Sequence, residues 1–543
     1  TIDPAATLLD RTNYTVTILG GAGGVTDVAG NPLAANYSWT FTTAVAQTPR
    51  PDPNTGPGGP VLVVTGTGTF GSYLTEILRA EGLNLFSVAT TSALTASGLA
   101  GSTTVVLAET TLTSDQVTAL TAWVTAGGNL IAVRPDPQLA GLLGLSAPTG
   151  TLAEGYIKVD TSTAPGQGIV AATMQFHGTA DLYTLLPGTQ LVAELYSTAS
   201  TATGRPAVTL RTVGTSGGSA AAFTYDLAGS VVKTRQGNPA WVNQNRDGQD
   251  GPNRSDDLYY GASATDPQPD YVDRSKIDIP QADEQQRLLA NVMTATTRDA
   301  MPLPRFWYLP RGKQAVIVMT ADNHDRGSGT TAATRFNQEI AASAAGCSVA
   351  DWECIRSTVY LYPANAMTNA QAKAYEDQGF EIALHTDTGC ASPTATEYTN
   401  QLAGQLSELT TTYPSLQPSK TIRNHCISWS DYTTMPGVQV ATGINLDTDY
   451  YYWPGSWVSD TPGLFTGSGF AQRFSTTTGQ LVDVYQATTQ LTDESLQSYP
   501  STAIALMDAA ITKGYYGTFV ANIHSNGSSE ASETYTVPIR IFT

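Results

Sequence analysis

The sequence is poor in charged residues and has no long apolar run. Only 13% of its 543 residues are charged, and 27 Lys and Arg stand against 46 Asp and Glu, which gives a formal net charge of −19. Excess negative charge repels nucleic-acid phosphates and anionic lipid. No apolar stretch reaches the roughly 18 residues that cross a bilayer. We therefore expect neither a nucleic-acid partner nor membrane insertion. The oligomeric state is left open.

Cysteine is also scarce. The chain has four, all in its last 200 residues: Cys347, Cys354, Cys390 and Cys426. With so few charges and so much Ser, Thr, Gly and Ala, this usage favours a secreted or cell-surface protein with two disulfides, for which three pairings exist. The alternative is four reduced thiols in a cytosolic protein. The chain opens at Thr1 without the basic and apolar regions of a signal peptide.

The length predicts several domains, at roughly 100–200 residues each. Residues 1–45 alternate apolar and polar positions between Gly- and Asn-rich turns, which is typical of a partial β-sandwich. The stretch from Gly24 to Thr43 resembles the end of bacterial Ig-like modules, so we expect the first strands of such a module to be missing. Residues 46–60 are rich in Pro and Gly and are interpreted as a linker.

Residues 61–150 alternate short apolar runs with amphipathic segments, which predicts a doubly wound α/β domain. Gly66, Gly68 and Gly71 have the spacing of a dinucleotide fingerprint, but the second strand lacks the acidic residue that holds a ribose, so we interpret them as a tight turn. The segment resembles class I glutamine amidotransferase-like domains. No Cys precedes Cys347, so the resemblance implies a scaffold without its nucleophile.

Residues 151–300 contain short strands between turns and end in a helix over 281–297. This pattern predicts a β-sandwich insertion that binds carbohydrate. Asp247, Asp250, Asp256 and Asp257 offer oxygen ligands for Ca²⁺, but their spacing misses the EF-hand loop, and a polar surface turn is the favoured interpretation.

Histidine is scarce as well, and its positions are informative. Of only five, four follow apolar runs in the C-terminal region: His324, His385, His425 and His524. Repeated βα units with polar residues at the carboxyl ends of strands predict a barrel over 301–543 with its active site at that face. Imidazoles and carboxylates gathered there suit a divalent metal, most simply Zn²⁺, which activates water for hydrolysis. The alternative is four unrelated core or surface histidines.

Residues 313–525 carry a further pattern. The segments in question are Thr320-Ala-Asp322-Asn323-His324, His385-Thr386, Arg423 to Ile427, Leu446-Asp-Thr-Asp449 and Asn522-Ile-His524. In this order they resemble the motifs of the polysaccharide deacetylase (NodB-homology) barrel, and more specifically those of the divergent fungal galactosaminogalactan deacetylases. The resemblance implies a deacetylase-type (β/α) barrel and a metal-dependent hydrolase.

The resemblance also implies roles for four residues. Asp322 would be the general base, kept ionised by Arg423, and His524 would be the general acid that protonates the departing amine. Asp449 stands near the family's acidic fourth motif. Two usual metal ligands are missing, because Asn323 replaces the second Asp and Gly389 stands at the place of the second His. The candidate ligands are therefore His385, His425, His324 and Asn323, with Asp387 in reserve.

The positions of the cysteines suggest a pairing. Cys390 lies five residues after His385, and Cys426 is adjacent to His425, so a disulfide between them would join two loops of the site. Cys347 and Cys354 would then close a short loop.

Aromatic residues near the acidic motif are candidates for stacking on sugar rings. They are Tyr451, Trp453, Trp457 and Trp429. The alternative is buried packing, which is the commoner use of such clusters. Consecutive residues cannot all face one core, however, so we expect some of these side chains to line the cleft.

We therefore predict a secreted, metal-dependent N-deacetylase of an N-acetylated hexosamine polysaccharide. One alternative is a carbohydrate-binding or adhesion protein whose barrel has lost catalysis; the two missing ligands favour it, and the retained Asp322 and His524 oppose it. A second alternative is a peptidoglycan amidase or peptidase. The absence of H-E-x-x-H opposes a zincin but not other metal-dependent types.

Overall fold

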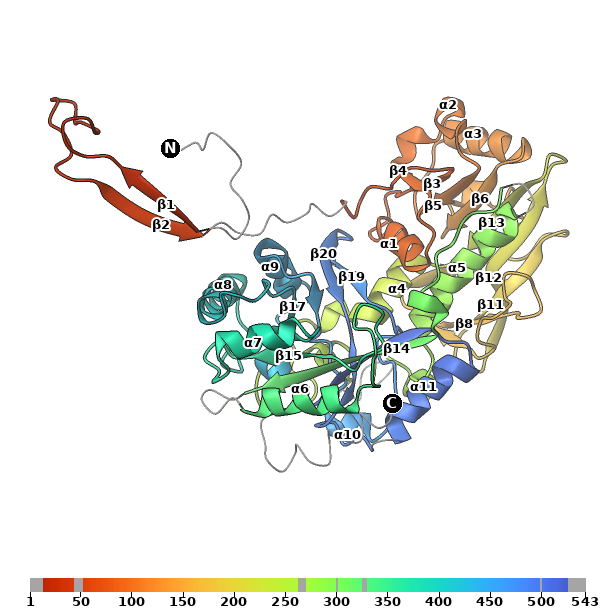
Figure 1. The fold of residues 1–543 in the computed structure, drawn as a ribbon. Coiled ribbons are helices and arrows are strands. Elements are labelled where there is room, and N and C mark those ends of the chain that lie inside the picture. The colour runs from red at the N-terminus through yellow and green to blue at the C-terminus, as the bar shows by residue number, and fades with distance from the viewer. Residues whose placement is uncertain are drawn as a thin grey trace. The chain divides into compact units, whose positions relative to one another are not determined.

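The computed structural model describes residues 13–42, 52–261, 270–298, 301–324, 330–498 and 501–525. It divides into two compact units, residues 1–51 and residues 52–543 (Figure 1). In the first unit, β1 (Asn13–Ile18) pairs antiparallel with β2 (Tyr37–Thr42). Val16 lies opposite Trp39 in this pair of strands. In the next pair along, the hydroxyls of Thr17 and Ser38 share a hydrogen bond of 2.7 Å.

The second unit contains a nine-stranded sheet in the order β4-β3-β5-β6-β13-β12-β11-β8-β9. Its parallel part is β3 (Val61–Val64), β4 (Phe86–Ala89), β5 (Thr104–Leu107), β6 (Asn129–Val133) and β13 (Gly218–Phe223). Its antiparallel part is β12 (Ala202–Val213), β11 (Gln190–Tyr196), β8 (Tyr156–Val159) and β9 (Met174–Gln175). The short strands β7 (Thr151–Ala153) and β10 (Thr179–Asp181) pair separately.

This sheet differs from the predicted β-sandwich insertion. β13 pairs parallel with β6, so the strands after residue 150 continue the α/β sheet. Ala220 and Ala222 face one hydrophobic core, and Ala221 and Phe223 face the other, which makes β13 a central strand buried on both faces. Sequence alternation identifies short strands but does not say which neighbour each one pairs with.

Helices cover the sheet. They are α1 (Tyr73–Ala80), α2 (Ala96–Leu99), α3 (Ser114–Thr125), α4 (Leu227–Gln236) and α5 (Gln281–Thr297). The predicted helix over 281–297 coincides with α5. Figure 1 shows α4 and α5 side by side, and they pack against each other.

The second large sheet has the order β19-β20-β18-β17-β16-β15-β14-β22-β21 and curls into a half-barrel (Figure 1). Its strands are β14 (Ala315–Asn323), β15 (Ser357–Leu361), β16 (Glu381–Thr386), β17 (Thr421–Asn424), β18 (Leu446–Asp447), β19 (Gln472–Ser475), β20 (Leu481–Gln486), β21 (Thr489–Thr492) and β22 (Gly517–Asn522). All neighbours are parallel except β19 and β20. In the part of the chain that the structure describes, β19 and β21 are the two edges of the sheet, so the half-barrel is open.

Six helices connect these strands: α6 (Thr330–Ala342), α7 (Asn369–Glu376), α8 (Ala395–Thr412), α9 (Thr434–Thr442), α10 (Gly455–Val458) and α11 (Ser501–Thr512). Capping boxes open α3, α7 and α8, because the threonine before each helix and the Gln or Glu three residues later satisfy each other's backbone N–H groups. α7 and α8 pack against β16, and α11 packs against β14. No helix of the described residues is long and apolar enough to cross a membrane.

Short 3-10 turns complete the second unit: η1 (Thr91–Ala93), η2 (Pro137–Leu139), η3 (Pro239–Trp241), η4 (Ser255–Leu258), η5 (Arg274–Lys276), η6 (Pro310–Gly312) and η7 (His425–Ile427).

Buried polar contacts join the two large sheets. Glu76 on α1 forms an ion pair of 2.9 Å with Arg473 on β19, and its other carboxylate oxygen accepts the Arg473 backbone N–H at 3.0 Å. Asp283 on α5 accepts hydrogen bonds from the Ser468 hydroxyl and the Gly469 backbone N–H. The two sheets therefore belong to one compact unit.

Candidate active site

The carboxyl ends of four parallel strands of this sheet bring the histidines together. Asp322 lies in β14 with His324 directly after it, His385 lies in β16, His425 follows β17 and His524 follows β22. The ring centroid of His324 lies 5.1 Å from that of His385, 4.7 Å from that of His425 and 5.1 Å from that of His524. This meeting point is where parallel sheets place their active sites.

These side chains open onto a cavity of about 200 Å³. Its lining residues are Arg254, Asp322, His324, His385, His425, Cys426, Ile427, Tyr451, Trp453, Glu494 and His524. The walls therefore combine imidazoles, carboxylates, a guanidinium and two aromatic rings.

His324 and His385 present nitrogen atoms to each other. The two Nε2 atoms are 3.1 Å apart, and Nδ1 of His385 lies 3.0 Å from the backbone carbonyl oxygen of Arg423. A carbonyl only accepts, so Nδ1 of His385 carries the proton and its Nε2 has a free lone pair. Burial lowers the pKa of His385 to about 3 and that of His324 to about 4, so both rings are neutral at pH 7.

This pair fits a divalent metal. Neutral imidazole nitrogens are zinc ligands, and Zn–N bonds of about 2.0–2.1 Å in a tetrahedral site separate two such nitrogens by about 3.3 Å. A ligand histidine commonly donates its other ring N–H to a carbonyl, as His385 does to Arg423.

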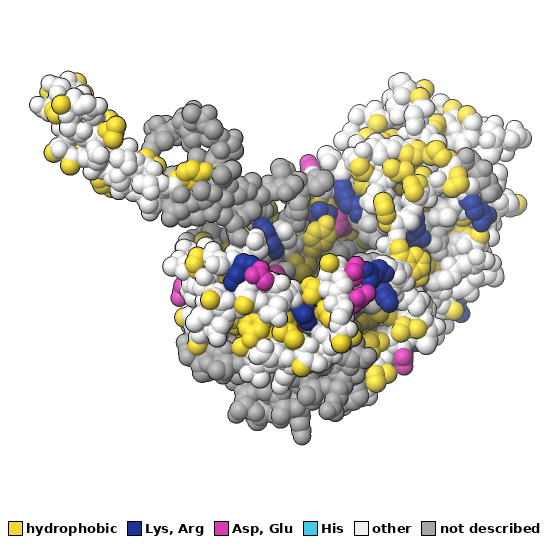
Figure 2. All heavy atoms as spheres, in the orientation of Figure 1, with side chains coloured by type: hydrophobic (Ala, Val, Ile, Leu, Met, Phe, Trp, Pro, Cys, Tyr) yellow, Lys and Arg dark blue, Asp and Glu magenta, His cyan; other side chains and the backbone are white. Residues whose placement is uncertain are grey.

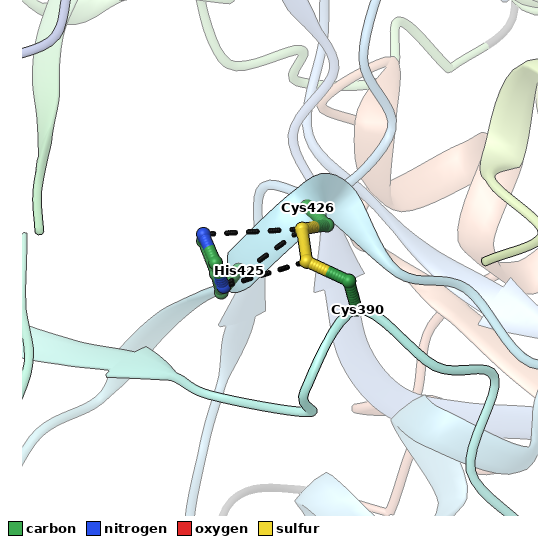
Figure 3. Close-up of side chains that lie close together, drawn as sticks. All are labelled: Cys390, His425 and Cys426. Carbon is green, nitrogen blue, oxygen red and sulfur yellow. Dashed lines mark hydrogen bonds between the residues drawn. A yellow bond between two sulfur atoms is a disulfide. The ribbon is translucent and has the colours of Figure 1, made fainter. Parts of the chain in front are cut away.

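His425 stands beside this pair and next to a disulfide (Figure 3). Its Nδ1 lies 3.7 Å from the Asp387 carboxylate and 3.7 Å from Sγ of Cys390. Cys390 is bonded to Cys426, and Cys347 to Cys354, which confirms the predicted pairing. Disulfide sulfurs are not thiolates, so of this group only the imidazole and the Asp387 carboxylate remain as metal donors.

Asp322 is a buried carboxylate held by charge and hydrogen bonds. Its Oδ1 pairs with Nη1 of Arg423 at 3.1 Å, and its Oδ2 accepts from Nδ2 of Asn522 at 2.8 Å. Burial alone would raise the pKa of Asp322, but the Arg423 guanidinium, followed by His385 and His524, holds that pKa well below its usual range. Arg423 is positioned in turn by the hydroxyls of Thr320 and Thr489, each at 2.9 Å.

His524 lies between two carboxylates. Its Nδ1 is 3.0 Å from Asp493 and its Nε2 is 2.7 Å from Glu494. Burial would lower the pKa of His524, but the hydrogen bonds to Asp493 and Glu494 raise it to about 11. His524 is therefore an imidazolium at neutral pH, with Nε2 4.0 Å from Oδ2 of Asp322.

Sequence reasoning missed Asp493 and Glu494. They follow β21, which pairs parallel with β22, so they reach the same face as His524. The pattern that could have indicated them is a pair of acidic residues directly after a short polar strand.

It also missed Arg254, which comes from the region before residue 300. Its Nε donates to the carbonyl oxygen of Cys426 at 3.2 Å, and the guanidinium forms part of the cavity wall. The two residues are 172 positions apart in the chain. No local pattern indicated that they would meet.

Asn323 and Asp449 are among the predicted site residues that do not line the cavity. Asn323 follows Asp322 on β14 and therefore points to the opposite face, where its amide bonds to Ser525 and to Asn365. The Asp449 carboxylate binds the backbone and side-chain N–H groups of Asn424. The structure thus gives Asn323 no place beside the histidine pair and gives Asp449 a partner outside the cavity.

The aromatic candidates divide in the same way. Tyr451 and Trp453 line the cavity, whereas Trp457 and Trp429 are each 1% exposed and belong to a hydrophobic core. Trp457 packs edge-on against Phe465, and Trp429 stacks on Phe474. Their large apolar surfaces are used for packing, so the prediction that these two bind substrate is not supported by their positions.

Comparison with known proteins gives a family for one part of the chain. A model of the bacterial Ig-like domain matches residues 1–43, which confirms the expected Ig-like character of the N-terminal segment. No curated protein matches the sequence.

Several solved structures show a distant likeness. A polysaccharide deacetylase from Bacillus cereus is 13% identical, with 42% of this chain and 87% of that chain covered and a TM-score of 0.24. A family 4 carbohydrate esterase from Bacillus anthracis is also 13% identical, with coverages of 38% and 80% and a TM-score of 0.20.

An exo-beta-1,4-mannosidase from an Opitutaceae bacterium is 15% identical, with 32% of each chain covered and a TM-score of 0.24, so the chain spans about a third of that protein. Similarity at this level assigns neither a fold nor a function to the whole chain.

Proposed function

We propose that this protein is a metal-dependent hydrolase that removes acetyl groups from an N-acetylated hexosamine polysaccharide. One observation carries the proposal: a single cavity holds a pair of neutral, facing imidazoles, an ionised carboxylate and a protonated imidazole. Metal-dependent amide hydrolysis uses three functions, which are a metal site, a proton acceptor and a proton donor.

His324 and His385 would hold the metal, with His425 and Asp387 as the nearest further donors. Two imidazoles favour Zn²⁺ over a hard cation such as Ca²⁺. When bound, the ion supplies a Lewis acid for the acetamide oxygen and acidifies water at neutral pH.

Asp322 is the proposed general base. The Arg423 guanidinium keeps it ionised throughout the physiological pH range, so it is always available to accept a proton from the attacking water. Asn522 binds its other oxygen and fixes the orientation of the carboxylate.

His524 is the proposed general acid. The amine that leaves an acetamide must be protonated, and His524 is held in the protonated form by Asp493 and Glu494. Its Nε2 lies 4.0 Å from Oδ2 of Asp322, and both residues line the cavity, so acid and base face the same space.

Two observations support a carbohydrate substrate: the order of the motifs in residues 313–525 and the residues of the cavity wall. Trp453, which is only partly buried, offers aromatic surface for a sugar ring, and Arg254 offers N–H donors for its hydroxyls. The Ig-like segment and the two disulfides are consistent with an extracellular site of action.

Acetate release from N-acetylgalactosamine and N-acetylglucosamine polymers tests the proposal. The wild-type chain should release acetate, and Asp322→Asn should lower kcat by about 10²–10⁴-fold. Glu76→Gln is the matched control, since it also removes a carboxylate from a buried ion pair but lies outside the cavity. If the wild type binds polymer without releasing acetate, the protein is a binding module; if it releases only peptide-linked products from peptidoglycan, it is an amidase.

A further inference from the structure

Three aspartates form a buried group beside the active-site wall. One carboxylate oxygen from each of Asp247, Asp256 and Asp257 lies within 4.8 Å of the other two. The side chains belong to residues that are only 6%, 0% and 2% exposed. Like charges this close and this buried repel strongly unless something compensates them.

Two of the three carboxylates have partners. Asp257 accepts the backbone N–H groups of Arg246, Asp247 and Arg254. Asp247 forms an ion pair of 3.2 Å with Nη1 of Arg254.

Asp256 differs from the other two. Neither of its carboxylate oxygens accepts a hydrogen bond from any described residue, although the side chain is fully buried and one of those oxygens belongs to the three-aspartate group. A buried carboxylate without a partner costs several kcal/mol, and native proteins leave few such groups. This orphaned side chain is the observation that indicates a missing ligand.

We infer that Asp247, Asp256 and Asp257 bind a hard divalent cation of the Ca²⁺ type. The donors are carboxylate oxygens alone, which suit Ca²⁺ and contrast with the imidazoles of the candidate active site. Three carboxylates and one guanidinium leave a local charge of −2 when all are ionised, and a divalent cation neutralises that charge. The favoured sequence interpretation, a solvated polar turn, does not fit side chains that are this buried.

The position of the group gives the ion a role. Arg254 connects Asp247 to the carbonyl oxygen of Cys426 in the cavity wall, and the backbone carbonyl oxygen of Asn253 accepts the backbone N–H of Trp429. Binding of a cation would fix the 246–257 loop and, through it, the Arg254 side of the cavity. The inference stands without the proposed function, because it concerns a second ion at separate residues.

Calcium binding to the full chain tests the inference. The protein is stripped with chelator, and Ca²⁺ is titrated by calorimetry while the melting temperature is followed with and without Ca²⁺. The wild type should bind one Ca²⁺ that Asp256→Asn binds at least tenfold more weakly, and the Ca²⁺-dependent rise in Tm should disappear in the variant. Asp250→Asn, an exposed residue of the same loop, is the matched control and should bind like the wild type.

Two results would overturn the inference. In the first, the wild type binds no Ca²⁺ and its Tm does not rise when Ca²⁺ is added. In the second, Asp256→Asn binds Ca²⁺ as tightly as the wild type. Asn has the shape of Asp and removes one of three repelling charges, so the variant should fold; if circular dichroism shows that it does not, Asp247→Asn is measured in its place with the same criteria.

Discussion

At the scale of single residues, the candidate site holds imidazoles in two charge states within one cavity. His324 and His385 are neutral because burial opposes their charge, whereas His524 is protonated because Asp493 and Glu494 outweigh its burial. A neutral imidazole binds metal and a charged one donates a proton. The local partners of each ring therefore decide its chemical role.

This difference predicts the pH dependence of activity. Activity should fall at alkaline pH when His524 loses its proton. Because the pKa of His524 is raised to about 11, this alkaline limb of the pH–rate profile lies far above neutrality. Glu494→Gln removes a charge that raises the pKa, so the alkaline limb of kcat should move down by at least about one pH unit, with kcat at pH 7 changed much less.

Measured pH–rate profiles check this shift. Glu408→Gln, which changes an exposed glutamate on α8, should leave the limb in place. An alkaline limb that stays fixed in active Glu494→Gln would show that His524 is not the acid or that Glu494 does not control it.

Some features of the site can be predicted from the sequence and others cannot, because a local sequence pattern indicates where a strand ends but not how strands are arranged. An apolar run followed by histidine marks the end of a parallel strand, so the positions of His324, His385, His425 and His524 could be anticipated. The run does not show on which face a neighbouring residue lies, and strand alternation turns Asn323 away from Asp322. Asp493 and Glu494 follow another strand, β21, and only the sheet order brings them to His524.

At the scale of elements, two disulfides of different span hold different loops. Cys390–Cys426 joins the loop after β16 to the turn after β17, across 36 positions, while Cys347–Cys354 spans seven. Only the first touches the cavity, where Cys426 is part of the wall and His425 lies against the sulfurs. Its constraint therefore acts on a candidate metal ligand.

Removing each disulfide separates these effects. Cys390→Ser/Cys426→Ser should lose bound metal faster during dialysis, by about tenfold, because the position of His425 is no longer fixed. Cys347→Ser/Cys354→Ser should keep metal like the wild type. Metal content by elemental mass spectrometry after timed dialysis distinguishes them, and equal retention in both variants would refute a role for the first disulfide in the site.

The elements also show where sequence patterns end. Alternation identified the strands after residue 150, but β13 joins β6 through a long-range pairing that no local pattern encodes. The same holds for Arg254, which belongs to the N-terminal half of the second unit and reaches the C-terminal cavity. Local patterns predict elements, whereas partners depend on the whole fold.

At the scale of the whole molecule, charge is sparse and used selectively. Figure 2 shows few Lys, Arg, Asp or Glu side chains on the face in view, in keeping with the 13% charged content. Several ion pairs are instead buried, and the Glu76–Arg473 pair joins the two large sheets. This pair should therefore couple the unfolding of the two sheets of residues 52–543.

Glu76→Gln tests this coupling. Arg473 would lose one buried partner and keep Asp483, so the free energy of unfolding should fall by about 3 kcal/mol, the low end for breaking a buried pair. Asp377→Asn removes an exposed pair with Lys373, which solvent screens, and should lower the free energy of unfolding much less. Denaturant unfolding followed by fluorescence measures both, and a similar small loss in both variants would contradict the coupling.

The central claim is that the facing His324 and His385 hold a catalytic metal. It is tested most directly by measuring divalent-metal content by elemental mass spectrometry and acetate release from N-acetylhexosamine polymer in the same sample, before and after chelation. The protein should hold about one divalent metal per chain, lose acetate release when the metal is removed, and recover it when Zn²⁺ is added. Acetate release that persists in fully stripped protein, or no metal and no acetate after Zn²⁺, Co²⁺ or Mn²⁺ is supplied, would contradict this claim.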